Sequence, residues 1–194
     1  MKRFHKPLGE RLGWKRLSTT FPLVTRWLRL RRDRVRIEGK REITFTYVES
    51  PGAVGVVPVT GDGRLVLIRQ YRYTVDEWGL EVPAGGMHDA GDASLEEVAR
   101  EELRQELGAN CERLEYIGYF YTAIGNSSQA FHVYLALDVA LDDGQSTEDT
   151  ELIELQPRPV REVVQLVHEG GIKDGASALA ILLCEDRLRE YGYL

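Results

Sequence analysis

The chain has 194 residues, of which 43% are hydrophobic and 29% are charged, and its formal net charge is −6 at pH 7. These values are typical of one globular domain of ordinary size, with room for a small appendage. No apolar run reaches the ~18 residues that a membrane-spanning helix needs, and the N-terminus has no apolar core followed by a small-residue cleavage site. The two cysteines, Cys111 and Cys184, match no metal-ligand spacing. We therefore expect a cytoplasmic protein with reduced thiols and no membrane partner.

The charge is distributed unevenly along the chain. Residues 1–41 contain fourteen Lys/Arg and three Asp/Glu, a net charge of +11, which leaves −17 for the remainder. Such a basic arm could bind nucleic acid or a membrane surface, and an Arg-rich start is also typical of organelle transit peptides. Because the segment has no recognisable nucleic-acid-binding motif, we expect it to pack on an acidic protein surface instead, such as a second copy of the chain. We expect no nucleic-acid partner.

The first half of the chain is predicted to consist mainly of strands. Residues 1–20 show no regular pattern. Alternating apolar residues over 34–47 predict a hairpin with one half-buried face. Further strands are expected at 53–59, where the apolar run is continuous, at 64–70 after a glycine-rich tight turn, and at 81–83.

The second half contains the predicted helices. Ser94, with Glu97 three residues later, is the sequence signature of a capping box, and Gly108 is a typical C-terminal stop, so a helix is predicted over 94–107. Strands are expected at 114–120, 131–139 and 152–155, and helices at 160–168 and 176–191. Because strands dominate the middle and helices are inserted or terminal, the predicted class is α+β with a mixed sheet.

The helix over 94–107 is rich in glutamate, which usually indicates a solvated face. At ~100° per residue, however, Glu102 and Glu106 fall inside the apolar stripe that should face the core. Two carboxylates there are costly unless they are paired or bind a cation, and at i, i+4 spacing they also repel each other. Mg²⁺ removes both penalties, since it accepts carboxylates together with waters and phosphate oxygens. The small residues of the preceding turn, 83–86, would let a backbone carbonyl and a phosphate come close. The helix and turn together predict a metal–pyrophosphate site.

Residues 86–109, GMHDAGDASLEEVAREELRQELGA, resemble the Nudix box, G-x5-E-x7-R-E-U-x-E-E-x-G-U with U aliphatic. From the right, Gly108, Glu106, Leu103 and Glu102 fall on box positions. From the left, Gly86 matches and Asp92 stands in for the Glu of the pattern. The sequence departs further in three places: one extra residue lies between the two halves, Gln105 replaces the first Glu of the Glu-Glu pair, and Glu101 stands where Arg is usual.

The flanking segments resemble the ADP-ribose pyrophosphatase branch of the Nudix hydrolases. They are LIRQYR at 67–72, LEVPAGG at 80–86 and GIKD at 171–174. The resemblance implies a Nudix α/β/α sandwich over residues 51–194, preceded over 1–50 by a basic arm and an antiparallel strand region that mediates a homodimer. Residues 122–125 read TAIG where the branch often has Pro-Ser-Pro-Gly, so a diphosphatase of UDP-glucose or GDP-mannose is the alternative.

By resemblance, the Ala84 carbonyl and the carboxylates of Glu102 and Glu106 would hold Mg²⁺, with Mn²⁺ able to replace it, and both carboxylates would be catalytic. Gln105 would add a neutral oxygen or water contact, so the second metal position is expected to be weak or missing. A loop after the core strands would supply the general base, Glu151, with Glu148 as the other candidate. The plain alternative for that loop is a solvated acidic turn.

The expected reaction is Mg²⁺-dependent hydrolysis of a nucleoside diphosphate sugar, ADP-ribose giving AMP and ribose 5-phosphate. Arg72 would clamp a phosphate and Arg69 is a weaker choice, although a surface ion pair would explain either. Glu81 would hydrogen-bond ribose or base, or else anchor an arginine. The remaining expected substrate residues are Gly86 and Trp27, the latter stacking on the base across a dimer interface or simply packing. The altered box could instead mark a catalytically inactive domain that binds a nucleotide sugar, and a nucleoside-triphosphate-cleaving enzyme is a further alternative.

Overall fold

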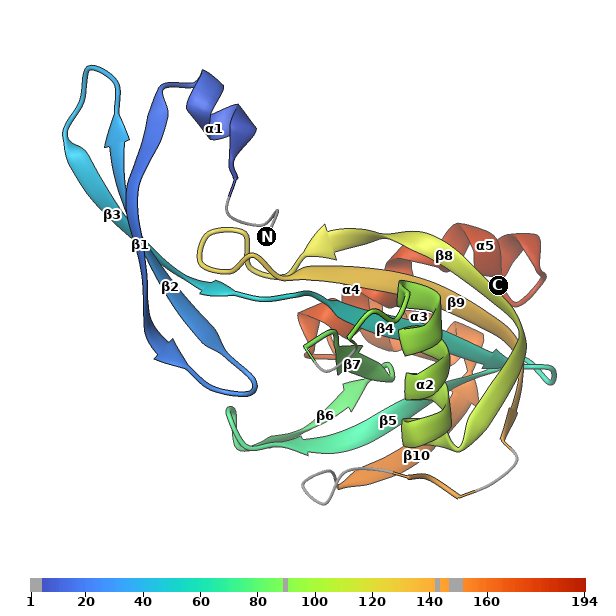
Figure 1. The fold of residues 1–194 in the computed structure, drawn as a ribbon. Helices are drawn as coiled ribbons and strands as arrows, with labels where there is room; N and C mark the ends of the chain where they lie inside the picture. Colours follow the sequence, from blue (N-terminus) through green and yellow to red (C-terminus); the bar gives the residue numbers. More distant parts are fainter. Residues whose placement is uncertain (1–4, 89–90, 142–143, 147–151) are drawn as a thin grey trace. The chain divides into compact units, whose positions relative to one another are not determined.

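The computed structural model describes residues 5–88, 91–141, 144–146 and 152–194, and it divides into two compact units (Figure 1). The N-terminal unit comprises Met1–Pro51 and Ala123–Gln129, and the main unit comprises Gly52–Thr122 and Ala130–Leu194. The first unit thus takes a short loop from the middle of the chain. None of the helices formed by the described residues has the length and apolar character needed to cross a membrane.

The N-terminal unit contains a three-stranded antiparallel sheet in the order β1-β2-β3. Its elements are the short helix α1 (Pro7–Arg11) and the strands β1 (Trp14–Val24), β2 (Arg29–Ile37) and β3 (Glu42–Glu49). The predicted hairpin is confirmed as β2 and β3. The expectation of irregular structure over residues 1–20 was wrong, because β1 begins at Trp14. Register shifts between Arg16 and Ser18 and between Thr20 and Leu23 interrupt the two-residue alternation that would have revealed this strand.

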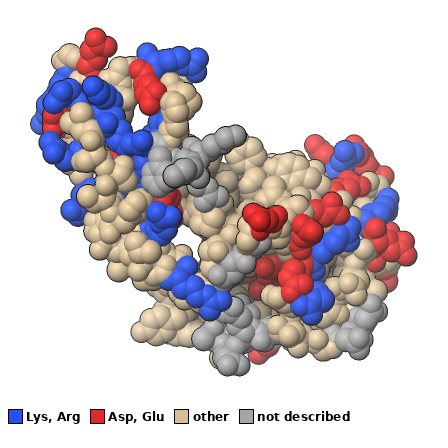
Figure 2. Space-filling view, viewed as in Figure 1, with Lys and Arg blue, Asp and Glu red and all other residues tan. Residues whose placement is uncertain are grey.

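The two faces of this sheet differ in burial. On one face, Arg31 is 1% exposed and its guanidinium contacts Asp33 at 2.8 Å and Glu49 at 2.7 Å, so the buried charge is paired. On the other face, Arg32, Arg34 and Arg36 are exposed. Figure 2 shows Lys and Arg side chains gathered over the strands of this unit. The loop at 123–129 joins β3 through hydrogen bonds between main-chain groups of Val48 and Asn126, 2.9 Å, and Val48 and Ser128, 3.0 Å.

The main unit is built on a seven-stranded sheet with the order β10-β5-β4-β9-β8, in which β6 pairs with β5 and β7 pairs with β4. The strands are β4 (Ala53–Thr60), β5 (Arg64–Arg72), β6 (Glu77–Glu81), β7 (Ala84–Gly86), β8 (Ala109–Tyr121), β9 (Ala130–Leu141) and β10 (Ile153–Pro159). The sheet is mixed, because β4 runs parallel to β9 while the other described pairs are antiparallel.

Helices cover both faces of this sheet (Figure 1). They are α2 (Leu95–Leu107), α3 (Val160–His168), α4 (Gly175–Leu183) and α5 (Glu185–Glu190). Helix α2 packs with Val54 and Val56 of β4, whereas α3, α4 and α5 pack on the opposite face with Val57 and Val59. Burial on both faces explains the continuous apolar run of β4. The α+β class, the Nudix α/β/α arrangement and the preceding antiparallel region are confirmed.

The C-terminal helix expected over 176–191 is two helices. At Cys184 the main-chain N–H bonds to the carbonyl of Ile181, three residues back, at 3.1 Å, and α5 starts from there. A hydrogen bond to the residue three positions back is typical of the tighter last turn of a helix. The apolar spacing of the two helices runs on without a break, so the sequence pattern did not reveal the division.

Candidate active site

Helix α2 begins and ends as the sequence predicts. The hydroxyl of Ser94 accepts a hydrogen bond from the Glu97 N–H at 3.2 Å, and the Ser94 N–H donates to the Glu97 carboxylate at 2.7 Å. These hydrogen bonds from Ser94 lower the pKa of the Glu97 carboxyl. Gly108 ends the helix with φ 60° and ψ 40°, the left-handed conformation that glycine adopts most readily. Both ends of the helix are therefore fixed by local contacts.

The two expected metal carboxylates lie where α2 meets β7. Glu106 is only 4% exposed, and its Oε2 accepts a hydrogen bond from the Ala84 N–H at 3.0 Å. Glu102 is half-buried. Its carboxylate lies so close to Gly85 that a Cβ on that residue would be 1.8 Å from Glu102 Oε1. The wheel placed both residues on the core-facing stripe, and the burial of Glu106 beside Leu103 and Leu107 confirms this for Glu106.

The segment expected as an open turn is the short strand β7. Gly86 pairs with Ala53, and Ala84 pairs with Gly55, so the segment lies along the end of β4. It is held further by a hydrogen bond from the Val56 N–H to the Pro83 carbonyl, 2.9 Å. Gly86 is also tightly surrounded, since a Cβ there would lie 2.4 Å from Nδ1 of His88. Small residues are required here because the side chains of α2 and His88 come up to the backbone.

Arg72 and Glu81 form a two-pronged ion pair. The Arg72 Nε donates to Glu81 at 2.8 Å and 3.1 Å, and its terminal nitrogen donates at 2.5 Å. Glu81 is buried, whereas 44% of the Arg72 side chain is exposed. The pKa of Arg72 is raised, chiefly by the hydrogen bonds to Glu81 and also by the charges of Glu106 and Asp174. Arg72 therefore lies within the field of the buried carboxylate of α2.

Two other expected site residues already have partners. Arg69 pairs with Glu154 at 2.8 Å, and its guanidinium lies over the Trp78 ring at 4.2 Å. The side-chain amide nitrogen of Gln105 donates to Glu101. These contacts match the plain alternative for Arg69 and turn the Gln105 amide nitrogen toward its own helix.

The remaining expected residues are Trp27 and the two candidates for the general base. Trp27 belongs to the N-terminal unit, in the turn between β1 and β2, where it is 59% exposed with the Arg26 guanidinium 4.4 Å from its ring centroid. Glu151 and Glu148, the candidates for the general base, lie outside the described residues.

The carboxylates fit a cation that shares its coordination with substrate. Within the described ranges, no group of three or more His, Cys, Asp or Glu is arranged to hold a metal ion. An all-protein cage is thus not formed by these residues. Mg²⁺ is commonly bound through one or two carboxylates plus waters and substrate phosphates. The pair Glu102 and Glu106, packed against the backbone of Ala84 and Gly85, is compatible with that kind of binding.

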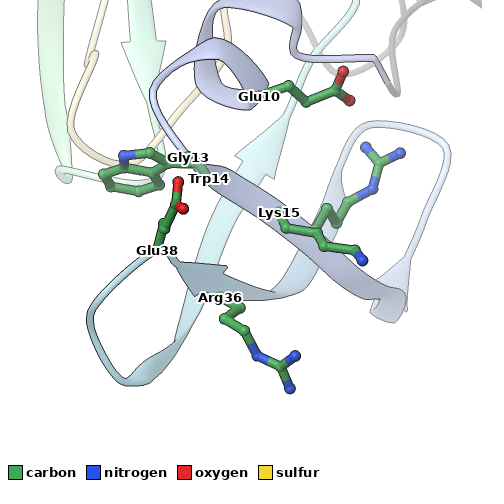
Figure 3. Close-up of a pocket in the computed structure, with 7 residues that line it drawn as sticks. Glu10, Gly13, Trp14, Lys15, Arg36 and Glu38 are labelled. Atoms are coloured by element: carbon green, nitrogen blue, oxygen red, sulfur yellow. The ribbon is translucent and has the colours of Figure 1, made fainter.

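A cavity that the sequence did not predict lies in the N-terminal unit (Figure 3). It has a volume of about 610 Å³ and lies beside α1, β1 and the end of β2. Its lining is of mixed charge and consists of Glu10, Gly13, Trp14, Lys15, Arg16, Arg36 and Glu38. None of these residues is among the expected site residues, and the cations and anions come from segments too far apart for spacing to reveal them.

Comparisons with known proteins identify relatives along most of the chain. A methanol dehydrogenase activator of Bacillus methanolicus is 26% identical over 175 residues, covering 90% of this chain and 94% of that protein. An ADP-ribose pyrophosphatase of Bacillus subtilis is 31% identical over 143 residues, covering 73% and 74%. A GDP-mannose pyrophosphatase of Pectobacterium atrosepticum is 29% identical over 151 residues, covering 73% and 76%.

A solved structure and a family model agree with these relatives. The crystal structure of an ADP compounds hydrolase matches with a TM-score of 0.79 at 19% identity, covering 94% of this chain and 97% of that one, so the two share a fold. Residues 49–177 match the family model of the NUDIX domain, and they include the capped helix, its two carboxylates and the glycines of β7. The chain therefore belongs to the Nudix family, in its ADP-ribose pyrophosphatase branch, and is a Nudix pyrophosphohydrolase.

Proposed function

We propose that the protein hydrolyses the pyrophosphate bond of ADP-ribose, giving AMP and ribose 5-phosphate, with Mg²⁺ as the metal. The observation that carries this proposal is the pair of α2 carboxylates at the glycine strand, Glu106 on the Ala84 N–H and Glu102 against Gly85. The similarity to the ADP-ribose pyrophosphatase of Bacillus subtilis supports the substrate. Nudix hydrolases generally use divalent metal ions, which supports the metal.

Each residue of the proposed site has a chemical role. The Ala84 carbonyl, Glu102 and Glu106 would hold the cation, and Gln105 would add a weaker neutral contact. The bound cation would neutralise phosphate charge and lower the pKa of a water molecule. Arg72, fixed by Glu81 and exposed beyond it, would bind a phosphate oxygen, with Gly86 allowing the substrate close to the backbone. Glu151, or Glu148 in its place, would take the proton from the attacking water.

The metal assignment is tested by Glu106→Gln. The amide oxygen can still accept from the Ala84 N–H, so we expect the variant to fold with nearly unchanged thermal stability. The lost charge should lower Mg²⁺-dependent kcat/KM by about 100-fold or more. Glu96→Gln, which removes an exposed carboxylate paired with Arg100 on the same helix, is the matched control and should keep near wild-type turnover. Undiminished turnover in Glu106→Gln would contradict the assignment.

The substrate is tested separately with a panel of ADP-ribose, GDP-mannose and UDP-glucose at equal Mg²⁺. We expect the highest kcat/KM with ADP-ribose and release of AMP, measured by chromatography of the products. The alternative sugar nucleotides are favoured by the sequence at 122–125 and by the similarity to a GDP-mannose pyrophosphatase. A preference for either of them would replace the proposed substrate while keeping the reaction.

We also propose that residues 1–50 form a dimerisation region and residues 51–194 the hydrolase domain. Large apolar side chains that a partner could cover are exposed around the turn between β1 and β2, which supports this proposal; they are Leu23, Val24 and Trp27. Trp27 would then stack on the substrate base of the partner copy. In this proposal the protein acts in the cytoplasm and binds neither nucleic acid nor a membrane.

A further inference from the structure

Ser177 is a buried serine of α4 whose hydroxyl makes two hydrogen bonds. It is 2% exposed, its hydroxyl donates to Asp174 Oδ2 at 2.6 Å, and the same oxygen accepts from the Val82 N–H at 3.0 Å. Asp174, the N-cap residue of α4, also accepts from the Ser177 N–H at 2.8 Å. A hydroxyl has one hydrogen, so Asp174 directs that hydrogen and leaves the oxygen to face Val82.

Val82 needs this partner because of its place between two strands. It lies after the last residue of β6 and before the first residue of β7, outside the ladder of either strand, and it is 1% exposed. A buried main-chain N–H without an acceptor is rare in native structures because it loses its hydrogen bond to water. The serine hydroxyl, 95 residues further along the chain, supplies the acceptor.

The residues on both sides of Val82 contact the proposed site. Glu81, just before it, holds the Arg72 guanidinium. Ala84, two residues after it, donates its N–H to Glu106, and Gly85 lies against the Glu102 carboxylate. A displacement of this segment therefore moves the arginine anchor and the backbone that faces both carboxylates together.

We propose that Asp174 and Ser177 are a positioning pair, which holds residues 81–85 in register with Glu102 and Glu106 and thereby sets the affinity of the carboxylates for a divalent cation. The inference rests on the proposed function for the metal assignment. Neither residue touches the substrate in this role; both act through the Val82 N–H. The charge of Asp174 also acts on Arg72, so geometry and charge must be separated by the choice of variants.

The main readout is Mn²⁺ binding to the full chain without substrate, measured by titration calorimetry. Ser177→Ala removes the acceptor for Val82, and Asp174→Ala removes the group that orients it. We expect each to weaken Mn²⁺ affinity by about 10- to 100-fold, the usual range for residues that support metal ligands. Because both residues act through the Val82 N–H, their effects on Mn²⁺ affinity should not add. The affinity of the double variant should lie within about threefold of that of the weaker-binding single variant.

Two further variants separate positioning from charge and from general stability. Asp174→Asn keeps an oxygen that can cap α4 and accept from the Ser177 hydroxyl. Its Mn²⁺ affinity should therefore lie within about threefold of the wild-type value. Val163→Ala makes a cavity in the same core, on α3, and leaves the side chains of Asp174 and Ser177 unchanged. It should lower Tm at least as much as Ser177→Ala while leaving Mn²⁺ affinity unchanged. Hydrogen exchange at the Val82 amide should become faster in Ser177→Ala and stay slow in Val163→Ala.

Wild-type Mn²⁺ affinity and wild-type kcat/KM in Ser177→Ala would overturn the inference. So would an equal loss of Mn²⁺ affinity in Val163→Ala, because the pair would then act only through stability. The proposed function fails in a different way: a wild-type chain that binds Mn²⁺ but leaves ADP-ribose intact contradicts the substrate alone. In that case the affinity differences among the variants still decide the role of Asp174 and Ser177.

Discussion

Gly85 contributes no side chain, and that absence determines how closely α2 can approach the neighbouring strand. The carboxylate of Glu102 occupies the space where a Cβ would lie, and Glu106 binds the backbone one residue earlier. The apolar spacing of α2 was enough to predict both glutamates from the sequence, because a helix wheel uses only local information. The contact of Ser177 with Val82 could not be predicted this way, because its two partners are 95 residues apart.

The close approach at Gly85 predicts a strong effect of one methyl group. In Gly85→Ala the new Cβ would meet Glu102 at 1.8 Å, so the carboxylate or the strand must move. We expect kcat/KM to fall by about 100-fold or more, because displacing a catalytic group by ~1 Å has an effect of this order. Gly125→Ala is the control, because nothing lies within 4 Å of its added Cβ. Both variants are compared by steady-state kinetics and by thermal unfolding. Similar turnover in the two would refute the prediction.

The buried thiol of Cys184 affects how the free energy of unfolding depends on pH. It is fully buried, and burial raises the pKa of its thiol from the ordinary 9.0 to about 12. Above pH 9 the thiol ionises in the unfolded chain but stays protonated in the fold, so stability falls as pH rises toward 12. The expected slope from this residue is about 1.4 kcal/mol per pH unit.

The measurement is urea unfolding at pH 8, 9 and 10 for the wild type and Cys184→Ala. The variant should start from a lower free energy of unfolding, because truncation leaves a cavity, but it should lose less stability over this range. Parallel losses in the two proteins would show that the Cys184 thiol does not carry the effect.

At the scale of elements, local signals decided which predictions succeeded. Helix α2 was placed correctly because its capping box and its C-terminal glycine are contained in its own sequence. Strand β1 was missed because its bulges shift the alternation, and its stability comes from pairing with β2. The three-residue strand β7 exists only through its pairing with β4. Sequence patterns report only the spacing of residues along the chain. These two strands depend on pairing with other strands, so their patterns did not reveal them.

The capping box predicts a modest and specific change in stability. Ser94→Ala removes the acceptor for the Glu97 N–H and should cost about 1 kcal/mol, lowering Tm by roughly 2–4 °C. Glu102 and Glu106 lie in the later turns of the helix, so kcat/KM should stay within about threefold of wild type. Glu97→Gln keeps the reciprocal bond to the Ser94 N–H and is the control.

The bond from the Ser94 main-chain N–H to Glu97 should also make stability depend on pH. The hydrogen bonds of Ser94, chiefly this one, lower the pKa of Glu97, so their contribution is present above the unfolded pKa of that carboxyl and is lost as pH falls through its folded pKa. Because Ser94→Ala keeps this N–H, the variant that tests the effect is Glu97→Gln, and the Tm difference between wild type and Glu97→Gln is expected to shrink on acidification. A constant difference from pH 7 to pH 3 would contradict this explanation.

At the scale of the whole molecule, the main division is one of charge. Residues 1–41 carry a net +11 and the rest carry −17, and the boundary between the compact units falls soon after, at Pro51. The sequence could therefore indicate an N-terminal region of distinct character. It could not show that residues 123–129 belong to that region, because the hydrogen bonds with β3 join distant parts of the chain.

Opposite charges on the two parts predict that self-association depends on salt. If the basic region of one copy meets the acidic surface of another, the dimer dissociation constant should rise about tenfold or more between 0.05 M and 0.5 M NaCl, because screening shortens the range of these charges. Sedimentation velocity over a concentration series measures it. A monomer under all conditions would contradict the proposed dimer, and a dimer indifferent to salt would contradict its electrostatic origin.

The parallel pairing of β4 with β9 also determines the order in which the protein can assemble. Ala53 pairs with Phe131 and Val57 with Leu135, so β4 can form this pairing only with a strand nearly 80 residues downstream. Pairings of such high sequence separation raise the contact order and slow the closure of a sheet. During synthesis from the N-terminus, α2 emerges well before β9. The carboxylates of α2 are thus translated early. The sheet on which α2 packs is completed only later, when the strand from Ala130 onward has been synthesised and has paired.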